Sequence, residues 1–271
     1  MAVWQGDFGK GQATGSGVWS DPGANPCLAY GPIPAAGTTG SGILLPPFRV
    51  GMVITGDYGS EFVLGKLVLA SATDLLPGQA YQLDKDYVLT LLTTANSVLN
   101  EEVVIAQVLA PQLAAGTYYV WGQRAGRTAV LAAASSVATG SGETTATAGT
   151  LKFPASATAS TKSVTPATAY QASSGITFTA TTTNGSPTLT NVSSINDLQL
   201  GAVITGTGLP SNAFVLAIRK TGNTWSIDIG TNTAGSYTTL QNCTATANTI
   251  TMTVTNMVTC NLDWPTLNKQ N

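Results

Sequence analysis

Apolar and polar residues alternate with a period of two through much of the chain, most strictly between residues 175 and 260. Ile176 and Phe178 alternate with threonines, and Ile250 and Met252 do the same near the end of the chain. Such alternation indicates strands with one buried and one exposed face. About seven such strands predict a second, accessory domain over 175–262, built as an Ig-like β-sandwich.

Strand signals of a different kind fill residues 49–150. Residues 62–69 form a continuous apolar run, 80–92 has the pattern of a hairpin, and 102–109 and 117–123 are two further strands. Many short strands at this spacing predict a compact β-barrel or sandwich. The fold class is therefore all-β.

The remaining segments differ in composition. Residues 1–48 contain ten glycines and six prolines, which predicts an extended arm, and 151–174, rich in small residues, predicts a linker. Residues 263–271 are expected to form a C-terminal tail. The arm also carries large apolar side chains, so it either docks on a partner or packs across its own domain. The candidates for partner contact in the arm are Trp4, Phe8, Trp19, Tyr30, Leu44 and Leu45.

One short pattern occurs twice. GMVITG at 51–56 and GAVITG at 201–206 are each followed by a similar apolar run, FVLGKL at 62–67 and FVLAIR at 214–219. Neither copy leads into the Gly-Lys-Ser/Thr element of a phosphate-binding loop. β-Branched residues bounded by glycine instead predict a strand, a turn and a second strand in both places.

Composition and charge exclude several classes of function. Charged residues make up 9% of the chain and the net charge is −2, so we expect neither nucleic acid nor an anionic membrane as a partner. No segment has the pattern of a secretory signal or a membrane-spanning helix. Cys27, Cys243 and Cys260 are expected to be free thiols, with a bridge between the last two the less favoured alternative.

The search for catalytic residues gives a negative expectation. The chain has no histidine, which removes the Ser-His-Asp and Cys-His arrangements and the commonest metal ligand. We expect no enzyme activity, no cofactor and no metal site. Paired carboxylates remain as the alternative of a polysaccharide-cleaving enzyme. The candidates for that role are Glu61, Asp84, Asp86, Glu101, Glu102, Asp197 and Asp228.

Two basic pairs are candidates for contact with an acidic partner surface. They are Arg124 with Arg127 and Arg219 with Lys220. The alternative interpretation for both pairs is solvated charge. Arg124 and Arg127 join the six arm residues as candidate contacts.

Long stretches of the chain resemble proteins of tailed-bacteriophage particles. GKLVLASATDLLPGQAYQLDKDYVLTLL at 65–92, the segment 101–137 with VVIAQV and GTYYVWG, and TTATAGTL at 144–151 are similar to the β-rich decoration, or cement, proteins of phage heads. The run from Leu198 to Pro210 resembles an accessory β-module of phage virion proteins. Residues 1–48 carry no such resemblance.

The resemblance implies a mechanical function. It implies a structural virion protein on the capsid exterior, made in the host cytoplasm, that bridges neighbouring major capsid subunits as a homotrimer. The alternative that it leaves open is a tail-fibre or host-surface protein, with the second domain binding glycans. A tail fibre would also be expected to carry a repeated shaft sequence, which this chain lacks.

Overall fold

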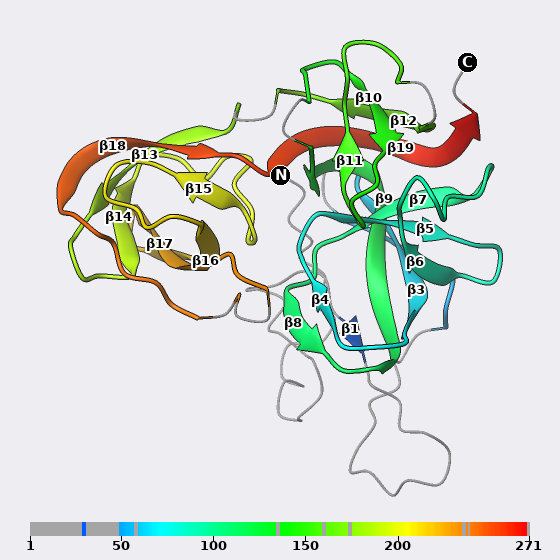
Figure 1. Ribbon diagram of the computed structural model, residues 1–271, viewed down its shortest axis with the longest axis horizontal. Helices are drawn as coiled ribbons and strands as arrows, with labels where there is room; N and C mark the ends of the chain where they lie inside the picture. The colour runs from blue at the N-terminus through cyan, green and yellow to red at the C-terminus, as the bar shows by residue number, and fades with distance from the viewer. Residues whose placement is uncertain are drawn as a thin grey trace, which may run out of the picture.

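The computed structural model describes residues 29–30, 49–56, 59–133, 136–158, 161–172, 175–234, 237 and 239–269, which form strands and turns with no α-helix among them (Figure 1). The all-β prediction is confirmed. The strands form an eleven-stranded sheet, here called the first body, a closed six-stranded barrel, and a two-stranded ribbon of β4 (Thr73–Leu75) and β8 (Ala110–Leu113).

Strand pairing closes part of the first body on itself. The pairings β9–β3, β3–β6, β6–β5, β5–β7 and β7–β9 form a complete circuit around a core that includes Leu64, Tyr81 and Trp121. The circuit closes because β9 is sixteen residues long and reaches both β3 and β7. The strands of the first body are β1 (Ala29–Tyr30), β2 (Val53–Thr55), β3 (Glu61–Leu69), β5 (Gln79–Leu83), β6 (Val88–Leu91), β7 (Glu102–Ala106), β9 (Gly116–Leu131), β10 (Ser141–Thr144), β11 (Leu151–Lys152), β12 (Lys162–Ala169) and β19 (Met257–Lys269).

The structure differs from the predicted linker and tail. Residues 151–174 contain β11 and β12, and residues 263–269 of the predicted tail belong to β19, which pairs with both β9 and β12. The small residues of β12 still alternate, and Val164, Ala167 and Ala169 are buried. The alternation of β12 is hard to recognise in the sequence because the strand carries almost no bulky apolar side chains.

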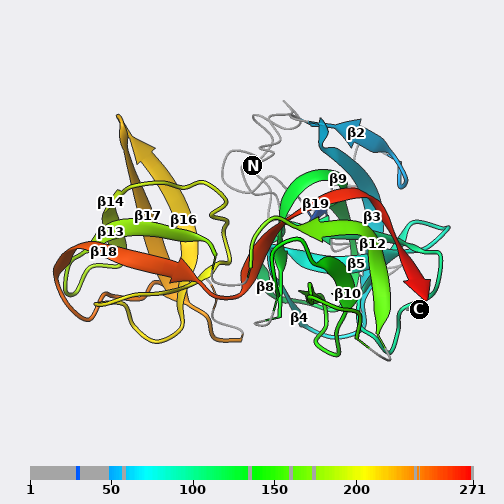
Figure 2. The same cartoon turned by 90° about the horizontal axis from the view of Figure 1, so that it is seen from above.

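The barrel is consequently an insertion in the first body. The chain leaves the first body after β12 and returns from β18 into β19, and Figure 2 shows this passage between the two bodies. The first body therefore comprises residues from both sides of the barrel sequence. Its second core takes side chains from β5, β7, β9, β12 and β19 and includes Phe153, Val164 and Leu267.

The second body is a closed barrel, whereas the sequence predicted an Ig-like sandwich. β13 pairs with β14 on one side and with β18 on the other, so the first and last strands meet. Period-two alternation is the same in a barrel and in a sandwich, because closure depends on which strands pair. The strands of the barrel are β13 (Thr177–Thr182), β14 (Thr188–Val192), β15 (Val203–Thr205), β16 (Ala213–Thr221), β17 (Thr224–Thr231) and β18 (Ala247–Val254).

The duplicated pattern forms the same strand–turn–strand unit twice, as predicted. Gly51 and Gly201 both have φ of +83°, in the left-handed region that favours glycine. The Gly51 amide donates to the Leu64 carbonyl, as the Gly201 amide does to Val215, at 2.8 and 2.9 Å. β2 pairs with β3 through Val53–Val63, and β15 with β16 through Val203–Phe214.

Candidate functional site

Most of the arm candidates lie outside the described residues. Those residues are Trp4, Phe8, Trp19, Leu44 and Leu45. The backbone of Tyr30 belongs to β1, where it pairs with Tyr119 of β9. The backbone of Tyr30 therefore lies alongside β9 of the first body. Contact of these six residues with a partner stays a prediction.

Arg124 lies in a charged cluster within the first body. Its guanidinium pairs with the carboxylate of Glu61 and lies 3.7 Å from an oxygen of Glu102. The indole N–H of Trp264, in β19, donates to the same Glu61 carboxylate at 3.2 Å. Burial raises the pKa of Glu102, Arg124 opposes that shift, and the charge of Glu61 adds to it. This cluster ties β3, β7, β9 and β19 together.

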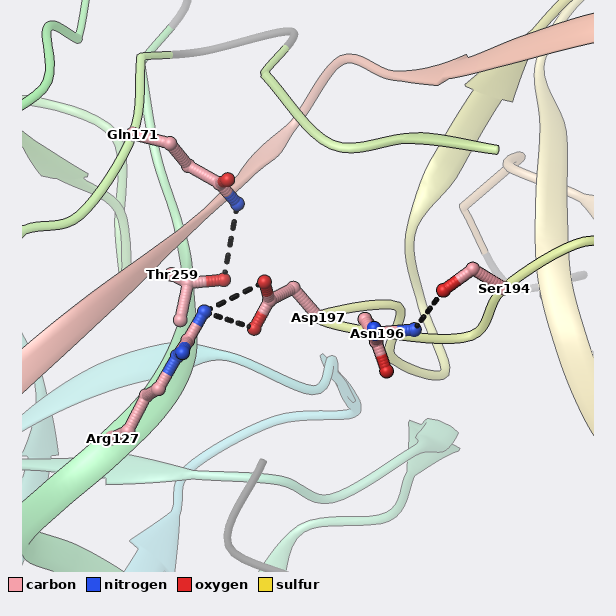
Figure 3. A network of polar contacts seen from close by, with 6 residues as sticks. All are labelled: Arg127, Gln171, Ser194, Asn196, Asp197 and Thr259. Atoms are coloured by element: carbon pink, nitrogen blue, oxygen red, sulfur yellow. Dashed lines mark hydrogen bonds and ion pairs between the residues drawn. The ribbon is translucent and has the colours of Figure 1, made fainter. Parts of the chain in front are cut away.

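Arg127 bridges the two bodies (Figure 3). Its guanidinium donates to both carboxylate oxygens of Asp197, at 2.6 and 2.7 Å, from β9 to the loop before β15. The same group lies over the ring of Tyr170, 4.8 Å from its centroid. Close by, the amide of Gln171 donates to the Thr259 hydroxyl at 3.2 Å. Both hydrogen bonds come from one guanidinium nitrogen, Nη2, and hydrogen bonds between charged groups such as these are stronger than neutral ones.

Apolar packing accompanies this ion pair. Ala129 and Leu131 of β9 belong to the same buried cluster as Leu198 and Ala202 of the barrel, and Met257 of β19 is a further member. We call these contacts, together with Arg127 and Asp197, the junction. The junction therefore extends the buried cluster of the barrel onto β9 and β19 of the first body.

The second basic pair is engaged within the barrel. Arg219 donates to Asp228 at 2.7 Å, and Asp228 also accepts from the hydroxyl of Thr188 at 2.8 Å. The Lys220 ammonium lies 5.2 Å from the centroid of the Trp225 ring. All four basic side chains named in the sequence analysis thus have partners in their own chain. Contact with another protein stays a prediction for them.

Most of the candidate carboxylates have a partner within the chain. Glu61, Asp197 and Asp228 hold the arginines just described, and Asp84 accepts from the amides of Asp86 and Val88 in the β5–β6 turn, at 2.9 and 2.8 Å. Within the described ranges, no three histidine, cysteine or acidic side chains are grouped so as to hold a metal ion. In that same part of the chain, no helix has the length and apolar character to span a membrane.

The cysteines agree with the prediction where the structure describes them. Cys243 and Cys260 are free and buried, and Cys27 lies outside the described residues. Burial raises the pKa of the Cys260 thiol, and burial likewise raises the pKa of Cys243 against two opposing backbone hydrogen bonds.

An exposed apolar surface lies at the end of the first body away from the barrel. β5 begins at Gln79, two residues after Pro77, which lies beside Gly201 of the barrel sequence. It ends at Leu83, which lines a groove of about 560 Å³ between residues 83–87 and 98–102. Large apolar side chains in and beside the groove are 37–50% exposed. We call this set the distal surface; it consists of Tyr87, Val98 and Leu99, which line the groove, and Met52, which follows Gly51 beside the Tyr87 ring.

Acidic groups border the distal surface. Asp84, Asp86, Glu101 and Glu102 line the groove with Lys85 as the one basic residue among its described lining. One oxygen of Glu101 and one of Glu102 are buried without a hydrogen-bond partner. Burial and the charge of Asp84 raise the pKa of Glu101. The surface is therefore apolar with an acidic border.

The sequence carried one overlooked signal for this surface. Val98 and Leu99 stand together within the polar run TTANSVLNEE, where an apolar pair has no alternation to place it in a strand. In the structure both side chains lie in a loop and are exposed, at 50% and 41%.

Comparison with known proteins gives no match among family models, curated proteins or solved structures.

Proposed function

We propose that the chain is a structural virion protein that docks on the outside of a phage capsid through its first body and bridges neighbouring subunits. The observation that carries the proposal is the distal surface, an exposed apolar set at the end opposite the barrel. Surfaces of this kind, with a polar border, are typical of protein-binding sites. The resemblance to decoration proteins supplies the class of partner.

The junction supports a mechanical function. A protein that resists the separation of capsid subunits transmits force through its own fold, and here the barrel is joined to the first body by a shared core and the Arg127–Asp197 pair. The barrel, an insertion held at the other end, is then presented away from the capsid. Binding that selects the assembled lattice stabilises it by mass action.

The first test is the abundance of the protein in purified particles. Quantitative mass spectrometry gives its copy number relative to the major capsid protein. A copy number near one per capsid subunit, or one trimer per local threefold position, is expected for a decoration protein. A handful of copies per particle contradicts the proposal and favours the alternative, attachment to the host surface from the tail or a vertex.

Matched variants test the docking surface itself. Val98→Asp places a charge on the distal surface, whereas Leu240→Asp places one on the barrel at a side chain of similar exposure, 50% against 54%. The measurement is co-sedimentation of each variant with particles that lack the protein. We expect Val98→Asp to weaken binding about tenfold or more and Leu240→Asp to leave it unchanged. Equal effects of the two variants contradict docking through the distal surface.

A further inference from the structure

The two copies of the duplicated unit differ in what covers their outer edge. In the barrel, β15 lies between β16 and β18, through Val203–Phe214 on one side and Ile204–Val254 on the other. Among the described residues, β2 pairs with β3 alone. Met52 and Val53 are 37% and 39% exposed beside this edge.

The backbone geometry of the two copies is so similar that the pairing of β15 with β18 can serve as a template for the outer edge of β2. The Leu64 amide donates to the Met52 carbonyl at 3.0 Å, and the equivalent Val215 amide donates to Ala202 at 2.9 Å. Together with the matching glycine bonds and registers, this makes Val53 the counterpart of Val203. The buried side chains also correspond, since Ile54 and Ile204 occupy the same step of the strand.

The barrel reveals which groups the outer edge presents. The Val203 carbonyl accepts from the Thr255 amide at 2.9 Å, and the Val203 amide donates to the side-chain oxygen of Asn256 at 2.8 Å. The side-chain amide of Asn256 then donates to the Gly201 carbonyl at 3.1 Å. The equivalent groups of Gly51 and Val53 face the open edge of β2. Outside the β2–β3 ladder, no hydrogen bond among the described residues engages Val53.

We infer that the outer edge of β2 is a strand-addition site that receives an extended segment of a partner protein. The chemistry of that segment follows from its counterpart in the barrel: β-branched or other apolar residues alternating with hydroxyl residues, ended by an asparagine, as in Ile250–Asn256. Main-chain hydrogen bonds supply affinity in such additions, and the alternate side chains supply specificity.

The direction of the added strand is also specified. β18 is antiparallel to β15, so the added segment runs antiparallel to β2 and its C-terminal end points toward Gly51. Tyr87 lies there, since its ring would contact any side chain placed on Gly51. The added strand therefore ends at the distal surface, beside the groove that Tyr87 lines.

The source of the segment rests on the proposed function: a strand from the capsid subunit on which the protein docks. An exposed strand edge is normally protected by charge, proline or a bulge. β2 has no charged residue between Gly51 and Gly56. Neither charge nor proline therefore protects this edge, which is three residues long.

The test uses the full chain and a synthetic peptide with the sequence of residues 250–256, ITMTVTN. Isothermal titration measures binding to the wild-type protein, to Val53→Lys, which protects the edge with a charge, and to Val53→Thr, which keeps the β-branch. We expect binding to wild type, a loss of about tenfold or more in Val53→Lys, and little change in Val53→Thr. Replacing the peptide's asparagine by alanine is expected to weaken binding about tenfold, because two hydrogen bonds are lost.

Amide hydrogen exchange on the wild-type protein keeps the test independent of how the variants fold. The expected result is slower exchange of the Val53 amide when the peptide is added. No binding, or binding that leaves Val53 exchange unchanged, overturns the inference. If Val53 is protected by raising the protein concentration alone, the occupant is a second copy and the assignment to a partner protein is overturned. None of these outcomes alters the copy number in particles, so the two proposals fail separately.

Discussion

Replacing Gly201 by alanine tests whether the duplicated unit depends on the left-handed conformation and close packing of its first glycine. Gly201 has φ of +83°, and a Cβ there would lie 2.9 Å from Cδ of Pro77 and 3.4 Å from Cε of Met257. The left-handed conformation costs an L-residue about 1–2 kcal/mol. Overpacking against well-ordered neighbours adds about 1–3 kcal/mol. We therefore expect Gly201→Ala to lower the free energy of unfolding by about 2–5 kcal/mol.

Gly222 provides the matched control. It has φ of +61°, and a Cβ placed there would meet no atom within 4 Å, so Gly222→Ala carries the conformational cost alone, about 1–2 kcal/mol. Urea unfolding followed by tryptophan fluorescence gives both free energies. In a thermal scan the difference corresponds to a shift of about 2–4 °C for each kcal/mol. If Gly201→Ala is no more destabilising than Gly222→Ala, the contact with Pro77 does not constrain the junction and the reasoning is refuted.

The remaining predictions concern the ion pair, pH and the thiols. Arg127→Ala is expected to lower the free energy of unfolding by about 1–2 kcal/mol, since the ion pair is half-exposed. A double-mutant cycle with Asp197→Ala should give a coupling energy near 1 kcal/mol, and a coupling energy of zero argues against the ion pair. The raised pKa of Glu102 means that the folded state binds its proton more tightly, so the stability of the wild type rises as the pH falls through that pKa. In thermal scans, Glu102→Gln should therefore gain less stability than the wild type between pH 7 and pH 5. If both proteins show the same dependence of stability on pH, the shift is contradicted. Native Cys243 and Cys260 should resist iodoacetamide and react in urea, as peptide mapping would measure; alkylation of native Cys260 contradicts its burial.

Most strands could be predicted because the alternation of apolar and polar residues depends only on neighbouring positions in the sequence. Phe178, Met252 and their neighbours point into the barrel as their pattern requires. The strand β12 could not be predicted in the same way, since two of its three buried positions are alanine and its exposed ones are a proline and a threonine. A sheet built from small residues has the same composition as a linker.

Contacts between residues far apart in the sequence could not be predicted. Arg127 and Asp197 are 70 positions apart, and nothing in the pattern around either one indicates the other. The sequence did identify Arg127 as a candidate for pairing with acidic groups, but the partner in the structure is in the same chain. The distal surface depends in the same way on the meeting of three separate segments around Met52, Tyr87 and Val98.

Asn256 explains why one copy of the duplicated unit is closed and the other has an open edge. Its side chain binds both Gly201 and Val203, and its backbone carbonyl accepts from the Ala132 amide of the first body at 2.9 Å. One residue, at the passage from β18 to β19, therefore closes the edge of the barrel copy and joins the barrel to the first body. The chain uses the outer edge of that copy for its own assembly, through a segment that follows directly in sequence. No described segment reaches the equivalent edge of β2, so the same geometry there is available to a strand from outside the chain.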